Sequence, residues 1–262
     1  MSNAALKIQD AGNVIPFEVL RFPKEPKPVS NKARPYNGCH KPAGESSEVY
    51  AFRTEEEIKA MIDVFDNRIE KAHTAARKQV ASRNKLLFLI GINVGLRASD
   101  LVTLRYSFFY DYDDDGTLKF KEFYTLQPKK QRKAKKFVKL FFNNTVKKAL
   151  TDYIRQYPFE NIDDYLFYSQ EGNGAITTCT LWRIIKGAAK EAHIEQPIGS
   201  HSLRKSFGFW IWHEAEDKDK ALVVLSQIFQ HSSVQTTRKY IGITDDEIKT
   251  AFESIELGLN FL

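Results

Sequence analysis

Two stretches near the C-terminus decide how this chain is interpreted: His201-Ser-Leu-Arg204 and Gln230-His231-Ser-Ser-Val-Gln-Thr-Thr-Arg-Lys-Tyr240. A third stretch, Gly95-Leu-Arg97-Ala-Ser-Asp100-Leu, lies well upstream of them. Together they offer two arginines, two histidines and a tyrosine as candidates for chemistry. Attack on a phosphodiester needs a nucleophile, cations on the non-bridging oxygens, a proton acceptor and an acid for the leaving oxygen. This set of side chains suits that reaction without a metal ion.

Each arginine has a local setting that fits phosphate binding, although neither is decisive alone. A guanidinium presents a planar fork of donors that matches phosphate oxygens. Arg97 follows Gly95, which is placed to end a helix. It is equally explained as an arginine at a helix C-terminus, where its positive charge interacts favourably with the helix macrodipole. Arg204 stands three residues after His201, so both face the same way on a helix. Asp100 either orients Arg97 through a charge-assisted hydrogen bond or caps the next helix.

The two histidines and the tyrosine complete the set. Ser200 is a candidate N-cap, which places His201 in a first helical turn, where backbone amides attract phosphate. His231 follows an apolar helix and stands nine residues before Tyr240. A tyrosine hydroxyl, with a pKa of about 10, is a poor nucleophile until cations lower that pKa, a role open to the two arginines. Taken alone, a tyrosine is more often a packing residue.

A run of basic residues separates two segments with strand character, 117–127 and 137–142. Like charges this dense repel one another, so the run is either a solvated loop or a contact surface for a polyanion. A lysine here is also placed to enter the minor groove and donate a proton to the leaving oxygen. The candidate DNA-binding residues are Lys129, Lys130, Arg132, Lys135 and Lys136.

The remaining pattern predicts a mainly α fold with a small antiparallel β-sheet (α+β). Six of the nine prolines lie in residues 16–42 among basic residues, which predicts an extended arm or linker over 1–51, either passive or lying along DNA. The folded domain is expected over 52–262. Thr54 followed by three glutamates predicts a helix start, and Asn144 is expected to cap a later helix. Further helices are expected at 86–94, 100–104, 178–192, 201–214, 218–230, 233–240 and 245–257.

Composition favours a soluble protein of the cytoplasm. Apolar residues make up 42% of the chain, enough for a core, and the net charge of +6 either favours a polyanionic partner or only aids solubility. The two cysteines, Cys39 and Cys179, are far apart, which fits a reducing compartment and argues against a disulfide scaffold or zinc finger. No stretch reaches the ~18 consecutive apolar residues that cross a bilayer, and no signal pattern opens the chain.

In their order and spacing, these motifs resemble the catalytic domain of the tyrosine recombinase (phage integrase) family. Gly-Leu-Arg97-Ala-Ser-Asp100-Leu resembles the family's first arginine box, and His-Ser-Leu-Arg204 resembles its His-x-x-Arg box. The segment from Gln230 to Tyr240 resembles the Leu-Gly-His box with the nucleophile, and is the most specific of the three. The resemblance covers about residues 52–262 and implies a helical catalytic domain with a small sheet.

The resemblance also implies a reaction. Double-stranded DNA would be cut and rejoined through a covalent 3′-phosphotyrosine at Tyr240, with no cofactor and no metal. Arg97 and Arg204 would bind the scissile phosphate. His201 would act as general base, and His231 would hydrogen-bond the phosphate.

Alignment with the family places its general-acid lysine at Lys133, with Lys130 and Lys135 as alternatives. The chain departs from the family at Phe229-Gln230, which replaces the usual Leu-Gly before the second histidine and predicts a stiffer turn. Family members usually carry a helical core-binding domain before the catalytic one. Either that domain is missing from this chain, or the basic arm replaces part of the DNA clamp.

We therefore expect a site-specific recombinase or integrase. The sequence leaves open whether it serves a phage, a transposon or another mobile element, or the resolution of chromosomes. A type IB topoisomerase-like or telomere-resolving enzyme remains an alternative, as does a catalytically idle DNA-binding protein of the same fold. The apolar segment after Tyr240 either folds back on its own domain or, as in the family, packs on a neighbouring protomer in a homotetramer on DNA. The free chain would then be a monomer, and no membrane partner is expected.

Overall fold

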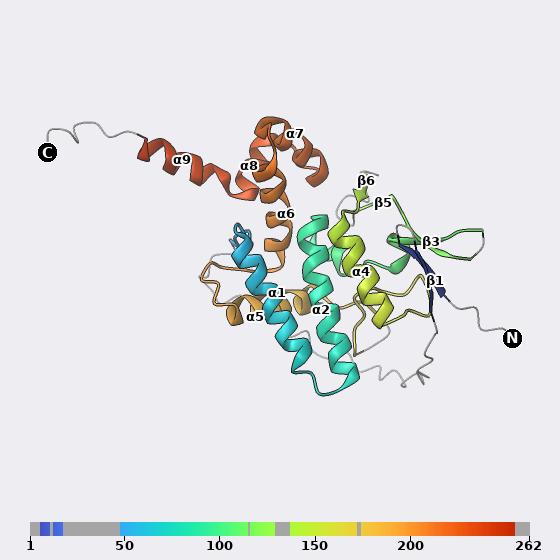
Figure 1. Ribbon diagram of the computed structural model, residues 1–262. Helices are drawn as coiled ribbons and strands as arrows, with labels where there is room; N and C mark the ends of the chain where they lie inside the picture. Colours follow the sequence, from blue (N-terminus) through green and yellow to red (C-terminus); the bar gives the residue numbers. More distant parts are fainter. Residues whose placement is uncertain are drawn as a thin grey trace, which may run out of the picture.

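The computed structural model describes residues 6–10, 13–17, 48–114, 116–128, 137–171 and 174–254, and most of these are helical (Figure 1). The mainly helical class expected from the sequence is confirmed. A short 3-10 helix, η1, spans Tyr106–Phe108. The α-helices are α1 (Glu55–Glu70), α2 (Ala75–Val94), α3 (Ala98–Leu101), α4 (Asn144–Gln156), α5 (Thr178–Glu191), α6 (Ser200–Glu214), α7 (Lys218–Phe229), α8 (Val234–Ile241) and α9 (Ile243–Glu253).

Two small sheets accompany the helices, where the sequence predicted one. The larger has the strand order β2-β1-β4-β3, with β1 and β4 parallel and the other neighbours antiparallel. The smaller is the antiparallel pair β5-β6, in which Phe123 lies opposite Phe141. Part of the arm expected to be a linker thus joins a sheet. The strands are β1 (Leu6–Asp10), β2 (Asn13–Phe17), β3 (Tyr110–Tyr112), β4 (Leu118–Phe120), β5 (Phe123–Leu126) and β6 (Val138–Phe141).

Helix α1 begins where the sequence predicted, at a capping box. The hydroxyl of Thr54 accepts a hydrogen bond from the backbone N–H of Glu57 at 3.1 Å. The carboxylate of Glu57 accepts in return from the backbone N–H groups of Thr54 and Arg53. These bonds satisfy amide groups that the first helical turn leaves without partners.

Helix α2 ends at Gly95, as predicted, although it begins earlier than the apolar run, at Ala75 behind the Thr74 cap. Gly95 has a φ of 65°, in the left-handed region. A Cβ at Gly95 would lie 2.2 Å from Cδ1 of Phe207 on α6. Glycine is therefore required here both by the backbone and by the close approach of α6.

Three predicted helix starts need correction. Asn143, not Asn144, caps α4 through its side-chain oxygen. Gly199, not Ser200, is the N-cap of α6, and Ser202 bonds back to its backbone N–H. The short helix expected at 100–104 is α3, which begins at Ala98 and places Asp100 inside the helix. In each case the side chains correctly predicted that a helix begins nearby. The exact first residue differs by one or two positions because it depends on the backbone conformation, which the side chains do not specify.

Two apolar clusters form the core, and α6 contributes to both. The larger cluster packs α1, α2, α4 and α5 and includes Phe88 and Leu203. The smaller packs α6, α7 and α8 and includes Phe209, Phe229 and Ile241. Figure 1 shows α6 leading from the main body towards α7 and α8. This helix therefore fixes the position of the C-terminal helices relative to the end of α2.

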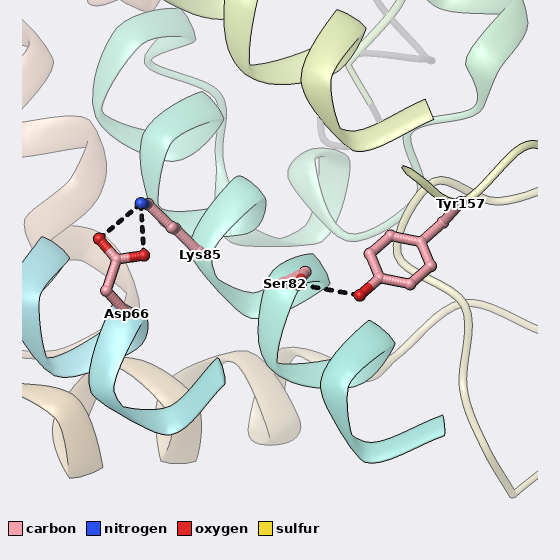
Figure 2. Close-up of polar contacts among 4 residues, drawn as sticks. All are labelled: Asp66, Ser82, Lys85 and Tyr157. Atoms are coloured by element: carbon pink, nitrogen blue, oxygen red, sulfur yellow. Dashed lines mark hydrogen bonds and ion pairs between the residues drawn. The ribbon is translucent and has the colours of Figure 1, made fainter. Parts of the chain in front are cut away.

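Polar contacts hold α2 against its neighbours (Figure 2). The Nζ of Lys85 on α2 donates to both carboxylate oxygens of Asp66 on α1, at 2.6 and 2.7 Å. The hydroxyls of Ser82 on α2 and Tyr157, the residue after α4, lie 3.4 Å apart. Such partly exposed contacts add little to the free energy of folding. They do fix the orientation of α2 relative to its neighbours, and so the position of the residues that follow α2.

The cysteine prediction is corrected for Cys179, which is disulfide-bonded. Cys39 lies outside the described residues. The prediction was wrong because it used the separation of the cysteines along the chain. That separation does not determine the distance between them in the fold, which decides whether a disulfide can form. Within the described ranges, no helix combines the length and apolar character needed to cross a bilayer.

Candidate active site

Arg204 lies at the centre of the candidate site and joins three segments of the chain. Its side chain, on α6, is buried, with 5% of its surface exposed. Nη1 donates to the backbone oxygen of Gly95 at 2.6 Å, and Nη2 donates to that of Phe229 at 3.1 Å. The guanidinium carbon also lies 4.2 Å from the centre of the Phe229 ring. Arg204 thus links the end of α2 to the end of α7.

Arg97 reaches the same carbonyl from the loop after α2. Its Nη2 donates to the backbone oxygen of Phe229 at 3.3 Å, so two guanidinium groups share one acceptor. Burial, together with the weaker effect of the Arg97 charge, lowers the pKa of Arg204 to about 10, although Tyr240 and Asp100 act in the opposite direction. Arg204 therefore remains charged at neutral pH, and an anion placed between the two guanidinium groups would relieve their repulsion.

The shared carbonyl is positioned by an unusual backbone conformation at Gln230. This residue ends α7 with a φ of 53°, in the left-handed region that favours glycine. Its backbone N–H donates to the oxygens of Gln227 and Ser226. Its side-chain Oε1 is buried and accepts no hydrogen bond from any described residue. The stiffer turn predicted for Phe229-Gln230 is therefore a turn in which a non-glycine residue occupies a strained conformation.

His231 lies beside the arginines and is held from two sides. Its backbone N–H donates to the oxygen of Ser226 at 2.9 Å. Its Nδ1 lies 3.0 Å from the hydroxyl of Thr237, which is fully buried on α8. Burial, followed by the charges of Arg204 and Arg97, lowers the pKa of His231 to about 4. The imidazole is therefore neutral at pH 7, and a Thr237 hydroxyl that donates to Nδ1 would leave Nε2 as the donor.

Tyr240 packs its ring against His231 and Phe229. Its centroid lies 5.2 Å from that of His231 and 5.4 Å from that of Phe229, both edge to face. Burial raises the pKa of Tyr240, while the charges of Arg204 and Arg97 and a hydrogen bond with Arg204 lower it by less. The arginines act as the sequence predicted, but burial outweighs them. In the absence of DNA the phenol is thus less acidic than an exposed tyrosine.

The family of the chain follows from a match to a known family profile. The profile of the phage integrase family matches residues 52–247, which include Arg97, Arg204, His231 and Tyr240. The chain belongs to the phage integrase family. Helices α1 to α8 and both arginine boxes lie within the matched region.

Individual phage integrase relatives show how much of each protein is shared. The chain is 30% identical over 171 residues to "Probable integrase/recombinase YoeC" of Bacillus subtilis, a match that covers 65% of this chain and 83% of YoeC. It is 26% identical over 204 residues to the tyrosine recombinase XerH of Campylobacter jejuni, covering 76% of this chain and 50% of XerH.

Solved structures share the fold of this phage integrase family member. XerH bound to palindromic difH DNA in a post-cleavage complex matches with a TM-score of 0.55 and 20% identity, over 79% of this chain and 53% of that one. The XerA recombinase matches with a TM-score of 0.55 and 21% identity, over 80% and 66%. The chain thus spans about half the length of XerH and about two thirds of XerA.

The structure brings together four of the six residues predicted to be catalytic in this phage integrase family member: Arg97, Arg204, His231 and Tyr240. The fifth, His201, lies in the first turn of α6 and is exposed. Its side chain is therefore exposed and not buried with the other four. The sixth, Lys133, lies outside the described residues.

The supporting and DNA-binding predictions have different outcomes. Asp100 is buried, with 3% of its surface exposed, and its charge raises the pKa of Arg204. The structure therefore connects this carboxylate electrostatically to Arg204, where the sequence considered only Arg97 or a helix cap. The other basic residues of the hairpin also lie outside the described residues: Lys129, Lys130, Arg132, Lys135 and Lys136.

Sequence reasoning missed four contributors to the site. The backbone oxygens of Gly95 and Phe229 leave no sequence signal beyond the turn residues beside them. Thr237 is detectable only as a small polar residue on the helix that carries the tyrosine. Lys205 follows Arg204 directly, and its Nζ lies 5.7 Å from the centre of the Tyr240 ring. Burial lowers the pKa of Lys205.

His231 should make the stability of the fold depend on pH. The pKa of its imidazole is about 4 in the fold and 6.5 in the unfolded chain, so the unfolded chain binds the proton first. The contribution is constant above pH 6.5 and is lost as the pH falls from 6.5 towards 4. We expect the free energy of unfolding in urea to fall between pH 7 and pH 5, and His231→Gln to remove part of that fall.

A matched control for this titration is His213→Gln, at an exposed histidine of α6. This change should leave the pH dependence as in the unmodified protein. If His231→Gln loses as much stability between pH 7 and pH 5 as the unmodified protein does, the imidazole is not held neutral by the fold.

Proposed function

We propose that this protein is a site-specific DNA strand transferase that cuts and rejoins DNA through a covalent 3′-phosphotyrosine at Tyr240. One observation carries the proposal: two guanidinium groups, Arg97 and Arg204, converge on a single point beside the Tyr240 ring. The carbonyl oxygen of Phe229 now occupies that point. Each Nη carries two hydrogens, so both arginines keep donors for a phosphate while they hold the carbonyl.

In the proposed reaction, the phenol oxygen of Tyr240 attacks the scissile phosphorus and forms an O–P bond. The bond from phosphorus to the 5′-oxygen breaks, and a protonated general acid converts that oxygen into a 5′-hydroxyl. Arg97 and Arg204 neutralise charge that grows on the non-bridging oxygens. His201, exposed in the first turn of α6, accepts the phenolic proton, and the neutral His231 donates a hydrogen bond to the phosphate. Attack by a 5′-hydroxyl on the phosphotyrosine reverses these steps.

Because burial raises the pKa of Tyr240, the phenol needs a proton acceptor to react at neutral pH. The resting site is therefore poorly nucleophilic, and the proposal assigns removal of the phenolic proton to His201.

The proposal assigns the general acid to Lys133, with Lys130 and Lys135 as the alternatives, and DNA contact to the rest of the basic hairpin. A substrate with a 5′-thiol leaving group needs little protonation and tests this assignment. If Lys133 is the acid, Lys133→Ala slows cleavage of the normal substrate and not of the thiol substrate. If the thiol substrate is slowed equally, the role belongs to another residue.

The assay for the proposed function uses a nicked suicide substrate, from which the released strand diffuses away and leaves the protein attached to DNA. A covalent adduct is expected under conditions in which the protein binds DNA, and its absence would favour the catalytically idle alternative. Strand exchange between two sites would then separate a recombinase from a topoisomerase-like or telomere-resolving enzyme. Occupied arginine, histidine and tyrosine positions favour an active enzyme.

We further propose a two-part organisation, with an arm over 1–51 and the catalytic domain over 52–262, acting on DNA in the cytoplasm. Helix α9 projects from the body (Figure 1), with Phe252 78% exposed and Ile248 51% exposed. These apolar side chains support packing of the C-terminal segment on a neighbouring protomer in a homotetramer on DNA. Sedimentation with and without duplex DNA tests whether the monomer assembles only when DNA is bound.

A further inference from the structure

A short segment before α1 runs beside α6 and is bonded to it at several points. The backbone N–H of Phe52 donates to the hydroxyl of Ser206 at 2.7 Å, within the core. The indole N–H of Trp210 donates to the backbone oxygen of Phe52 at 2.9 Å. These bonds, together with the capping box that follows, hold Arg53 at a defined place on the α6 surface.

From that place Arg53 reaches the end of the helix that carries the candidate nucleophile. Its Nη2 donates to the backbone oxygen of Gly242 at 2.7 Å, a contact between residues 189 positions apart. The guanidinium carbon lies 5.2 Å from the centre of the Phe209 ring, which supports the side chain from α6. Gly242 has a φ of 79°, and a Cβ there would lie 2.7 Å from this same Nη2. Glycine at this position thus makes room for the guanidinium.

This contact lies close to the phenol in the chain and in the fold. Helix α8 has only eight residues, and a helix of that length is not stable by itself, so tertiary contacts decide where it lies. Thr237, in the middle of α8, is held by His231. Tyr240 stands two residues before Gly242, at the end that Arg53 holds. The two contacts together fix the rotation and the direction of the helix that carries the phenol.

We propose that Arg53 is a positioning residue for the cleavage reaction: by holding the carbonyl of Gly242, it keeps Tyr240 directed at the two arginines. The inference rests on the proposed function of Tyr240 and adds a residue outside the motifs of the pocket. Arg53 contacts neither phosphate nor the reacting atoms in this role. Its loss would let the end of α8 move, and displacement of a reacting group by about 1 Å can cost a factor of about 100 in rate.

The test measures two quantities on the full chain, for the unmodified protein and for Arg53→Ala. Amide hydrogen exchange over 238–242 is expected to become about tenfold faster in the variant, because opening this end of α8 no longer breaks the guanidinium contact. The rate of adduct formation on the suicide substrate, at saturating protein, is expected to fall by a factor of about 10 to 100. The DNA dissociation constant should stay within about twofold, since the contact is not to phosphate.

Two further variants separate positioning from a general loss of structure. Arg53→Lys keeps one donor and should recover part of the cleavage rate. Arg68→Ala removes a partly exposed arginine of α1 that is bonded to Glu191, and should change neither the exchange over 238–242 nor the cleavage rate. If Arg53→Ala does not fold, Gly242→Ala disrupts the same contact from its other end and should speed the same exchange.

The outcomes are distinct. Unchanged exchange over 238–242 in Arg53→Ala overturns the proposal, as does weaker DNA binding with a normal rate at saturation, which would make Arg53 a phosphate contact. If the unmodified protein forms no adduct, the proposed function fails, while the exchange experiment still decides whether Arg53 holds α8. Faster exchange with slower cleavage and unchanged affinity supports the proposal.

Discussion

Replacing Arg204 by alanine is expected to reduce covalent adduct formation by a factor of about 1000 or more. The residue is the one side chain described that joins Gly95, Phe229 and, by a hydrogen bond, Tyr240. Its loss removes a cation from the proposed phosphate site and also the donor that lowers the pKa of the phenol. Arg204→Lys should not restore the rate, because an ammonium group cannot reproduce the planar fork that holds two carbonyl oxygens at once.

Arg204→Ala should also destabilise the fold, by about 1–3 kcal/mol, because it leaves buried carbonyl oxygens with fewer donors. Arg83→Ala is the matched control. Arg83 is equally buried, at 4% exposure, and bonds the backbone oxygen of Tyr168, away from the pocket. Arg83→Ala should lower the urea midpoint of unfolding by an amount similar to that of Arg204→Ala, and should leave the cleavage rate of the folded protein unchanged. If the two variants cleave equally well per folded molecule, Arg204 has only a structural role.

Replacing Gly95 by alanine is expected to give the second large effect, this time on stability. A side chain in the left-handed region costs about 1–2 kcal/mol. At Gly95 the Cβ would also lie 2.2 Å from the Phe207 ring, and such overpacking costs about 1–3 kcal/mol more. Because Gly95 supplies the carbonyl that holds Arg204, movement of this turn should also displace the arginine.

Gly116 provides a close control for this substitution. Its φ is 73°, against 65° at Gly95, but a Cβ there would meet nothing within 4 Å. Gly116→Ala should therefore show only the backbone cost. Urea unfolding of both variants isolates the steric part as the difference, and a difference near zero would mean that α6 and the end of α2 are not packed as closely as described.

The sequence predicted the parts of this fold that depend on near neighbours. The capping box at Thr54, the helix end at Gly95 and the helix that carries Tyr240 each follow from side chains within one or two turns. It could not place the pairing of β1 with β4, which joins the arm to a sheet more than a hundred residues away. Nor could it locate the start of α6 to the residue, because Gly199 acts through its backbone.

The site was predictable as a list of residues and not as an electrostatic environment. The order of the motifs identified Arg97, Arg204, His231 and Tyr240, and the fold brings them together. The raised pKa of Tyr240 and the lowered pKa of His231 depend on burial, which no motif records. The Phe229 carbonyl and the contact between Arg53 and Gly242 are likewise products of tertiary structure. They join positions 132 and 189 residues apart.

The account depends most on the identity of the residue that becomes joined to DNA. Protein trapped on a suicide substrate can be digested and the DNA-linked peptide mapped by mass spectrometry, with Tyr240→Phe as the matched variant. We expect the 3′-phosphate to be attached to Tyr240, and the variant to bind the same DNA without forming an adduct. Attachment at any other residue, or an undiminished adduct in Tyr240→Phe, would contradict the proposal that the two arginines, His231 and Tyr240 form one active site.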